Sequence, residues 1–330
     1  MLFAIATSFT LKAQFIEDAL RYSQNNGTYT VRAGALGTAF HGLSDDIGAM
    51  MYNPAGLSLL TKSEFTLGLG FAANNTSALF MGANETFKSN NAYFNNIGLV
   101  VPINMGDRNA SFGIGYFMET NFDNNISFSG INAKSSFVDW QAKNGPGNET
   151  GSYADNLAYH LWLAGDDLKT PIVGGNQQIA FIQEKGGLHS ITTGFAMELS
   201  KYISAGFTIS GKWGRFKYHN KFEEAIVVPN KYTDSSTKQF VYDSLTKKTD
   251  TILNQCDFNN MTYESDLEQN IGGISGSIGI MAKLNKFFRF GVSIKFPSYY
   301  SVDEVFSESA SATFDSPHFK LGKSEELRKS

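Results

Sequence analysis

The sequence predicts an all-β fold, an antiparallel β-barrel of the outer-membrane type, behind an N-terminal segment that is not part of the barrel wall. Three observations support this prediction. The 330 residues include 28 Phe, 14 Tyr and 32 Gly, whereas only 18% of residues are charged, which suits strands that face lipid. Seven segments alternate apolar with small or polar residues. Short and long connections also alternate along the chain.

Residues 1–13 match the last part of a secretory signal peptide. An apolar run from Met1 ends in the small residue Ala13, although the basic region that normally precedes such a run is missing. A buried N-terminal strand is the alternative. A signal would take the protein out of the cytoplasm, and a lone cysteine, Cys256, cannot form an internal disulfide. We therefore expect a bacterial envelope protein.

Residues 14–62 lack the alternation and instead show short helix-like patches broken by Gly, Asn and Pro. Within them, Pro54 fixes its own φ and biases Asn53 away from helix, while the Asn53 side chain can bond neighbouring backbone groups. The run Asn53, Pro54 and Ala55 is thus predicted to be a rigid turn that holds shape. A plain turn without any role in transport is the alternative.

The wall is predicted from alternation with a period of two, because side chains of a lipid-facing strand point by turns to hydrocarbon and to the lumen. The seven alternating segments cover residues 65–71, 97–103, 112–118, 191–199, 203–213, 274–284 and 288–296. A soluble β-sandwich also alternates, but its wet face would carry more Lys, Glu and Asp than the Gly, Ser and Thr rows seen here.

The connections favour the barrel over the sandwich. Short turns are expected near residues 104–109, 200–202 and 285–286, and long extracellular loops at about 121–186 and 219–268. Short periplasmic turns opposite long outer loops are typical of outer-membrane barrels. No run of about 18 apolar residues predicts a membrane-spanning helix.

No residue pattern predicts catalysis. The five histidines lack metal-ligand spacing, and the acidic pairs are adjacent residues in loop-like contexts. A net charge of −4 lacks the basic footprint of a nucleic-acid-binding protein. We therefore expect no enzyme activity, no cofactor, no metal and no nucleic-acid partner.

The chain resembles the FadL/TodX-type outer-membrane transporters of long-chain fatty acids and aromatic hydrocarbons. The resemblance rests on Gly34–Leu60, with further support from Val101-Pro102-Ile103 and from the run Arg289 to Pro297. Within Gly34–Leu60 it is carried by Gly37, Ala39, Phe40, Asp45, Asp46 and the stretch Tyr52 to Leu57.

The resemblance implies a hatch over residues 14–62 that plugs a monomeric barrel of fourteen strands. Residues 63–330 would supply about seven of these, and the polar stretch 307–330 reads as loop. Because an open sheet edge cannot stand in hydrocarbon, we expect either a fragment of a longer product or a chain that needs a partner. The implied partners are a hydrophobic small molecule and outer-membrane lipid.

By the same resemblance, the third strand kinks inward beside a lateral exit. Gly113 and Gly115 are the candidates for this kink or bulge, with ordinary lumen-facing glycine as the alternative.

Two further sets of candidate site residues follow. An outer substrate groove is expected at Phe137, Trp140, Leu161 and Trp162, or else a compact lid formed by the same residues. Lys212, Arg289 and Lys295 fall on the lumen side by parity and could meet a carboxylate. Pairing with the hatch acids Asp45, Asp46 or Glu17 is the favoured alternative for these cations.

The predicted function is passive uptake of hydrophobic compounds through a plugged barrel with lateral release. A non-transporting surface protein, such as an adhesin or a structural barrel, is the rival, and a hatch argues against it. A soluble lipid-binding β protein would require that the first residues are not a signal. No residue selects one substrate.

Overall fold

The computed structural model describes residues 16–23, 28–145, 156–165, 168–227, 233–243, 248–255, 258–285 and 288–314. The signal peptide expected over residues 1–13, the side chain of Glu17, Cys256 and the residues from 315 onward lie outside this description.

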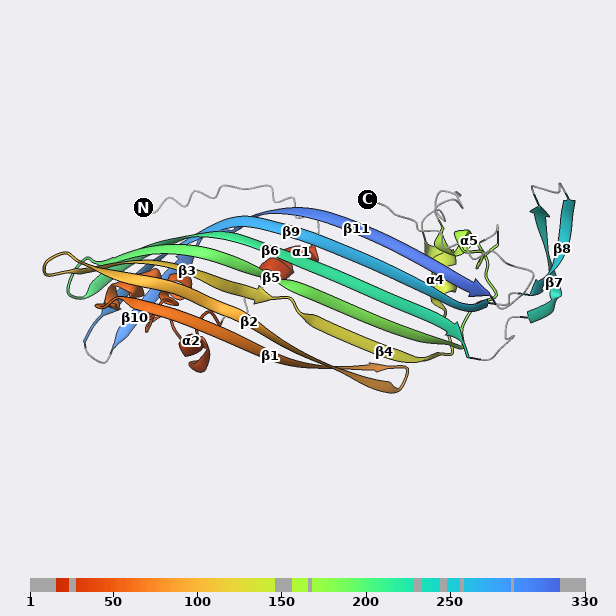
Figure 1. Ribbon diagram of the computed structural model, residues 1–330, viewed down its shortest axis with the longest axis horizontal. Helices are drawn as coiled ribbons and strands as arrows, with labels where there is room; N and C mark the ends of the chain where they lie inside the picture. The colour runs from red at the N-terminus through yellow and green to blue at the C-terminus, as the bar shows by residue number, and fades with distance from the viewer. Residues whose placement is uncertain are drawn as a thin grey trace, which may run out of the picture.

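One antiparallel sheet of long strands dominates the fold and curls into half a barrel (Figure 1). Its strands are β1 (Glu64–Phe80), β2 (Ala83–Asn104), β3 (Asn109–Asn121), β4 (Asn124–Asn132), β5 (Asn176–Glu198), β6 (Ile203–Ile226), β9 (Phe258–Lys283), β10 (Arg289–Lys295) and β11 (Tyr299–Phe314). β7 (Thr233–Asp243) and β8 (Lys248–Gln255) form a separate hairpin.

The sheet has seven strand positions, as the alternation predicted. β3 and β4 both pair with β5, and β10 and β11 both pair with β9, so each of these two couples fills one position in the wall. The order across the wall is therefore β1, β2, β3 with β4, β5, β6, β9, and β10 with β11. Among the described residues, β1 and the β10–β11 couple form the two edges.

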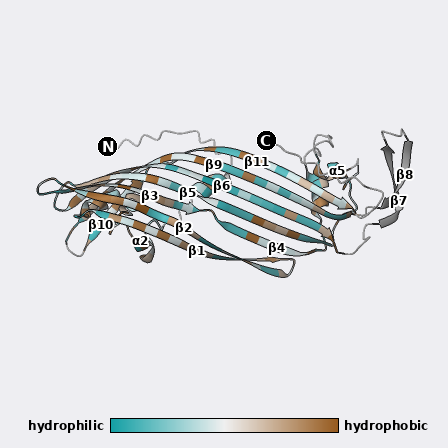
Figure 2. Cartoon of the chain, in the orientation of Figure 1, coloured by the Kyte–Doolittle hydropathy of each residue, from teal (hydrophilic) through white to brown (hydrophobic). Residues whose placement is uncertain are grey.

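The two faces of the wall differ as expected. On β10, Phe290, Val292 and Ile294 are 61%, 68% and 57% exposed, whereas Ser190 and Thr192 on the inner face of β5 are fully buried. Apolar residues gather toward the end with the short turns, and polar residues dominate the other half (Figure 2). The apolar side chains thus point outward from the curled sheet.

The strands are longer than the sequence analysis expected, so the loop ranges 121–186 and 219–268 were wrong in extent. β4 continues the third strand to Asn132, and β5, β6 and β9 also run far into the supposed loops. β11 likewise occupies the first part of the loop expected from Ser307, as far as Phe314. Backbone hydrogen bonds form whatever the polarity of the side chains, so the polar halves of the strands show no apolar alternation in the sequence. Among the described residues, the long connections between strands of the main sheet lie within 133–175 and, with the β7–β8 hairpin, within 227–257.

Short turns lie where they were expected, between β2 and β3, β5 and β6, and β9 and β10. One connection at the opposite end is also short. Met81 and Gly82, with φ of 50° and 85°, form a two-residue turn between β1 and β2, as type I′ hairpins require.

The N-terminal segment forms short helical pieces that the sheet surrounds. These are α1 (Ile16–Ser23), α2 (Val31–Ala35), α3 (Ala49–Tyr52) and the 3-10 helix η1 (Pro54–Leu59). The Thr30 side chain caps α2 by accepting from Ala33 N. None of the described helices is long and apolar enough to cross a membrane.

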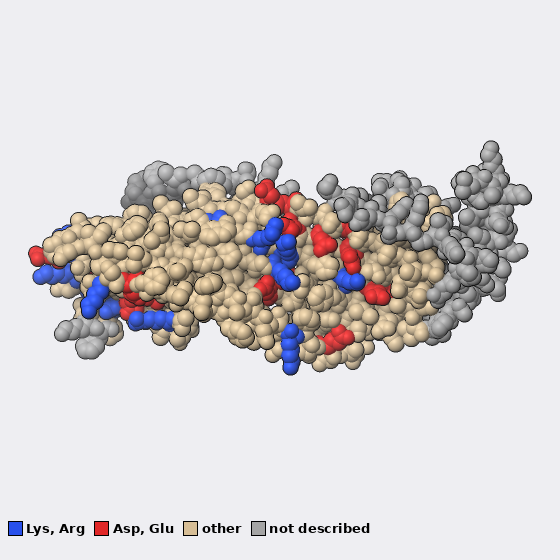
Figure 3. Space-filling model, in the orientation of Figure 1, with Lys and Arg blue, Asp and Glu red and all other residues tan. Residues whose placement is uncertain are grey.

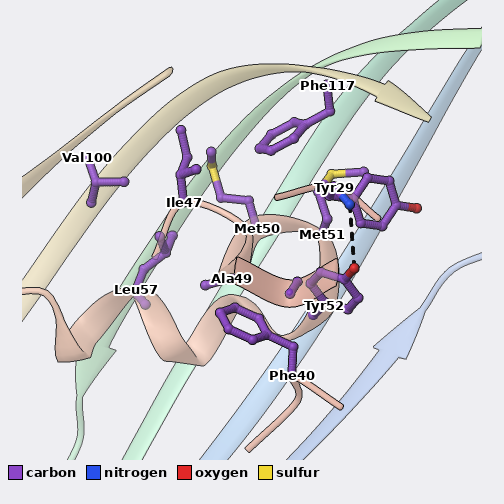
Figure 4. Packing of buried hydrophobic residues seen from close by; sticks show 12 residues of the cluster. Tyr29, Phe40, Ile47, Ala49, Met50, Met51, Tyr52, Leu57, Val100 and Phe117 are labelled. Atoms are coloured by element: carbon purple, nitrogen blue, oxygen red, sulfur yellow. Dashed lines mark hydrogen bonds between the residues drawn. The ribbon is translucent and has the colours of Figure 1, made fainter. Parts of the chain in front are cut away.

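We use the name hatch for residues 28–62 only as a label for the part of the expected range 14–62 that packs against the inner face of the sheet at the end with the short turns. Its apolar side chains form one buried cluster with the wall residues Val100 and Phe117 (Figure 4). Tyr29, Phe40 and Tyr52 meet edge to face in this cluster, an arrangement that adds to the energy of burial.

Glycines on the inner face of the wall let the hatch approach closely. A Cβ on Gly206 would lie 2.6 Å from the Pro54 carbonyl group, and one on Gly279 would overlap Asn53 Oδ1. A Cβ would also overlap hatch atoms at Gly98 and Gly291, and it would be tight against the side chains of Ile47, Met50 or Leu57 at Gly113, Gly115 and Gly194. We call these seven residues the glycine socket. A side chain at Gly206, Gly279 or Gly291 would collide with the hatch at its closest approach to the wall.

Substitution Gly206→Ala is expected to loosen the hatch, because its Cβ would collide with the backbone of Pro54 and Ala55. Overpacking of this kind costs about 1–3 kcal/mol. Hydrogen exchange of residues 49–59 should therefore accelerate. The control is Gly211→Ala on the same strand, where a Cβ meets no atom within 4 Å. Equal protection of the hatch in both variants would contradict the socket.

Candidate functional site

Asn53 ties the hatch to the wall. Its side chain is fully buried, and Oδ1 accepts from Ala55 N at 3.2 Å, which caps η1. Nδ2 donates to His41 O at 3.0 Å and to Ile280 O of β9 at 3.2 Å. Pro54 and Ala55 are buried at the start of η1. The predicted bonding of Asn53 to nearby backbone is confirmed, and it extends to a wall strand that lies far away in sequence.

Gly113 and Gly115 do not mark the irregularity of the third strand. β3 pairs with β5 without a register shift from Ala110 to Met118, and the shift follows between Met118 and Thr120. A second break separates β3 from β4 at residues 122–123. Gly113 and Gly115 instead face Met50 and Ile47 of the hatch, as lumen-facing glycines do.

A seam opens in the wall beyond this irregularity. Ladder pairing between β2 and β3 ends at Asn96 and Phe117, and no ladder joins β2 to β4. Side chains connect β4 to the β1–β2 hairpin instead. Ser127 Oγ donates to Glu85 Oε2 of β2 at 3.2 Å, and the ring of Phe80, at the end of β1, lies 4.7 Å from that of Phe128. We call this junction the seam.

Asp123 lies at the end of the seam nearest to the β2–β3 ladder, and it contacts β1, β2 and β5. Its side chain contacts Asn91 of β2 and accepts from Gly186 N of β5 at 3.1 Å, and its backbone oxygen accepts from Asn74 of β1 at 3.3 Å. At the seam the wall is held by these contacts and lacks the continuous backbone hydrogen bonds that join its other neighbouring strands. The seam is therefore the weakest junction described within the sheet.

Lys212 lies on the lumen side, as parity predicted, and forms an ion pair there. Its Nζ lies 2.6 Å from Glu119 Oε2, with both side chains at least 90% buried, and it donates to Tyr300 Oη at 3.2 Å. Lys295 points inward as well, with Nζ 5.6 Å from the centre of the Tyr29 ring. Arg289 shares the inner face of β10 but is exposed at its end.

The hatch acids named as partners of these cations pair within the hatch instead. Asp45 binds Arg32 at 2.9 Å, and Asp46 accepts from Thr30 Oγ1 at 3.0 Å and from Gly48 N at 2.7 Å. Local donors engage both oxygens of Asp46 but only one of Asp45, whose Oδ1 is buried without a hydrogen-bond partner among the described residues. Lys212 pairs with the wall residue Glu119 instead. The expectation of pairing was right for Lys212, but the expected partner was wrong.

Burial raises the pKa of the Asp46 carboxyl above its usual value, although the bonds from Thr30 and Gly48 oppose this shift. Burial and the nearby Asp18 carboxylate also raise the pKa of Tyr22, on α1, to about 12. Tyr22 is therefore neutral at physiological pH and packs against Phe122 and Tyr300. This contact brings α1 to the break between β3 and β4.

The residues expected to form an outer groove divide into buried and exposed members. Phe137 begins α4 (Phe137–Asn144) and packs on Phe222 and Tyr263, with ring centres 5.0 and 5.4 Å away. Leu161, after α5 (Leu157–His160), is buried in the same lid.

Trp140 and Trp162 are 54% and 69% exposed. The compact-lid alternative therefore describes Phe137 and Leu161, and the two tryptophans remain open to a ligand.

Two acidic residues at the site escaped the sequence analysis. Glu119 lies where the register shifts, so it breaks the alternation that was searched for, and Asp123 occupies a strand break. Glu224, of the acidic pair Glu223 and Glu224 expected in a loop as a solvated or capping group, is instead buried on β6, where it accepts from Phe137 N at 2.7 Å and from Asn176 at 2.7 Å. Isolated acids inside apolar segments are the sequence signal that would have singled out Glu119.

Comparison with protein-family models, with curated proteins and with solved structures gives no match. Within the described residues, no group of three or more His, Cys, Asp or Glu is placed to hold a metal ion.

Substitution Lys212→Met should destabilise the fold by about 3–5 kcal/mol, because it leaves the Glu119 carboxylate buried without its partner. Denaturant unfolding in detergent micelles measures this change. Lys283→Met is the matched control, since its pair with Glu198 is more exposed and its loss should therefore cost less than that of Lys212. Adding Glu119→Gln to Lys212→Met should restore most of the loss. Equal effects of the two lysine changes would contradict this account.

Because the pKa of the Asp46 carboxyl is raised in the folded protein, we expect the hatch to be more stable at low pH. A folded-state pKa raised above the unfolded one gives stability that is present at low pH and lost as pH rises through the folded value. Hydrogen exchange of residues 48–52, corrected for the intrinsic rate, should therefore slow on acidification. In Asp46→Asn this dependence should disappear, whereas Asp45→Asn should retain it. A persistent pH dependence in Asp46→Asn would refute this assignment.

Proposed function

We propose that this chain forms the hatch and part of the wall of an outer-membrane barrel for passive uptake of hydrophobic compounds. Long-chain fatty acids and aromatic hydrocarbons are the substrate classes expected from the sequence. Substrates enter the lumen from the outer end and leave sideways into the membrane through the seam.

The observation that carries this proposal is an apolar belt on the outward face. On β6 it runs from Ile203 to Trp213, and every outward residue in this range is apolar or glycine. About eleven residues at about 3.3 Å each extend roughly 33 Å along the strand. At a tilt of about 40° they cover about 25 Å, the height of the apolar band in outer-membrane barrels.

Aromatic residues border this belt at both ends. Tyr202 is 63% exposed at the turn end, and Tyr116, His189 and Trp213 meet at the other end, with ring centres 5.8–6.1 Å apart. Aromatic side chains prefer the boundary between hydrocarbon and water. Figure 3 shows few charges over this part of the surface and a concentration of charges beyond it.

The position of the seam supports lateral release. Its lower end lies next to Phe94 and Phe71, which face outward with 60% and 71% exposure. An apolar molecule that leaves the lumen here meets the belt directly. Its passage separates side chains without breaking a backbone ladder, which would leave unpaired N–H and C=O groups in hydrocarbon.

The inside of the wall supports an apolar cargo. Lys212 is already paired with Glu119, and the neighbouring inner face is apolar, with Phe122 and Phe216 packed in a buried cluster. The hatch blocks free diffusion of solutes, for which a structural barrel or an adhesin has no need. In hydrocarbon, the edges β1 and β10–β11 require pairing partners, and we expect further strands there.

Closing the seam covalently should reduce uptake of a labelled long-chain fatty acid or of toluene. The test uses Glu85→Cys and Ser127→Cys in a Cys256→Ser background, joined by a short bis-maleimide. Uptake by cells should fall several-fold after cross-linking, because β2 and β4 can no longer separate.

The matched control joins Ser77→Cys to Thr86→Cys. These side chains lie 2.9 Å apart within the β1–β2 hairpin, so this link does not bridge the seam. Uptake that is unchanged by the seam link would reject lateral release. Equal uptake with and without the gene would reject transport altogether.

A further inference from the structure

Three cations lie together on the outward face, just past the aromatic end of the apolar belt. Lys185 is on β5, and Arg215 and Lys217 are on β6. Lys185 stands directly opposite Lys217 in the ladder, and Arg215 is opposite Gly187. The Arg215 and Lys217 side chains are 56% and 48% exposed, and Figure 3 shows basic side chains gathered over this region.

Acidic groups do not balance this cluster. Glu268 is shared, with one oxygen 2.5 Å from Arg215 and the other 3.1 Å from Lys217. Lys185 forms no ion pair with a described residue. The nearby Asp123 directs its carboxylate to Gly186 N and Asn91. Since like charges opposite each other destabilise a sheet, an anion bound between Lys185 and Lys217 would relieve a built-in repulsion.

The excess charge is confined to one height on the wall. Toward the short turns, the next outward pair is Trp213 opposite His189, which ends the apolar belt. In the other direction, His219 lies 2.7 Å from Asp266 and Lys221 forms an ion pair with Glu264 at 3.2 Å. Among the described residues on the outward face of β5, β6 and β9 beyond Trp213, the layer of Arg215, Lys185 and Lys217 carries more positive than negative groups.

That height is where lipid headgroups lie. Arg215 and Lys217 follow Trp213 by about 7 and 13 Å along the strand, or by about 5 and 10 Å along the membrane normal at a tilt of about 40°. The headgroup layer on each side of a bilayer is about 5–8 Å thick. The backbone of Arg215 therefore lies at the level of lipid phosphate, and the long side chains of Lys185 and Lys217, just above it, can extend down to that level.

We propose that Lys185, Arg215 and Lys217 bind the phosphate group of a membrane lipid, whose acyl chains lie along the apolar belt below Trp213. This inference rests on the membrane placement in the proposed function. The partner is a lipid and not a free anion, because the cations are exposed on an open surface and the adjoining belt binds acyl chains.

The test uses the full chain with Trp140→Phe and Trp162→Phe, so that Trp213 alone reports on its surroundings. The probe is phosphatidic acid in mixed detergent micelles, compared with diacylglycerol, which lacks only the phosphate. We expect a saturable change in Trp213 fluorescence with phosphatidic acid alone. Lys185→Gln with Lys217→Gln should weaken it about tenfold or more, because each basic residue contributes to attraction of anionic lipid.

Two matched variants test the direction of the effect. Lys221→Gln removes a basic residue of the same strand that already has a partner, so binding should stay unchanged. Glu268→Gln removes the shared carboxylate, so binding should tighten. Circular dichroism of each variant confirms that it is folded. Equal binding by the parent and the double lysine variant, or an equal response to diacylglycerol or inorganic phosphate, would overturn the proposal.

Lipids with brominated acyl chains separate this failure from failure of the proposed function. Quenching of Trp213 by bromine without any dependence on phosphate would reject the lipid site and keep the membrane placement. Absence of quenching would reject the placement, and the lipid site with it.

Discussion

The hatch reaches the barrel wall because the wall carries glycine where the hatch backbone crosses it. A side chain at Gly206 or Gly279 would occupy the space of Pro54 or Asn53. This close approach lets Asn53 donate to Ile280 O on the wall while it caps η1. It also brings Tyr29 and Met50 into one apolar cluster with Phe117. The position of the hatch against the curled sheet depends on the absence of these side chains.

Two kinds of junction hold the wall together, and they differ in what it takes to separate them. β5 and β6 share a ladder over the whole of Asn176–Glu198, so their separation would expose a long row of backbone groups. The β1–β2 hairpin is joined to β4 and to the break before it through Glu85, Asp123 and the contact between Phe80 and Phe128. Side-chain contacts can form and break one at a time, so separation at the seam would expose far fewer backbone groups.

The sequence predicted the wall where apolar alternation is strong, as in the segment from Phe288 to Phe296, and it predicted which side chains face outward. It did not predict the polar halves of β5, β6 and β9, because Gln, Asn and Ser rows alternate without a change in hydropathy. The sequence also did not predict which residue pairs with Lys212. Glu119 is 93 positions away in sequence, and the register shift beside it removes the parity on which such a prediction depends.

The length of the strands beyond the aromatic border has a consequence for how such a protein meets its surroundings. From Trp213 to the end of β6 at Ile226 the chain climbs a further distance of about 43 Å along the strand. In the proposed orientation the strands extend well above the lipid headgroups, and α4 and α5 lie at their far end. Large particles, such as antibodies or phages, would contact this far end first and stay far from the bilayer. A water-insoluble molecule could follow the inner face of the extended strands through the polysaccharide layer to the membrane.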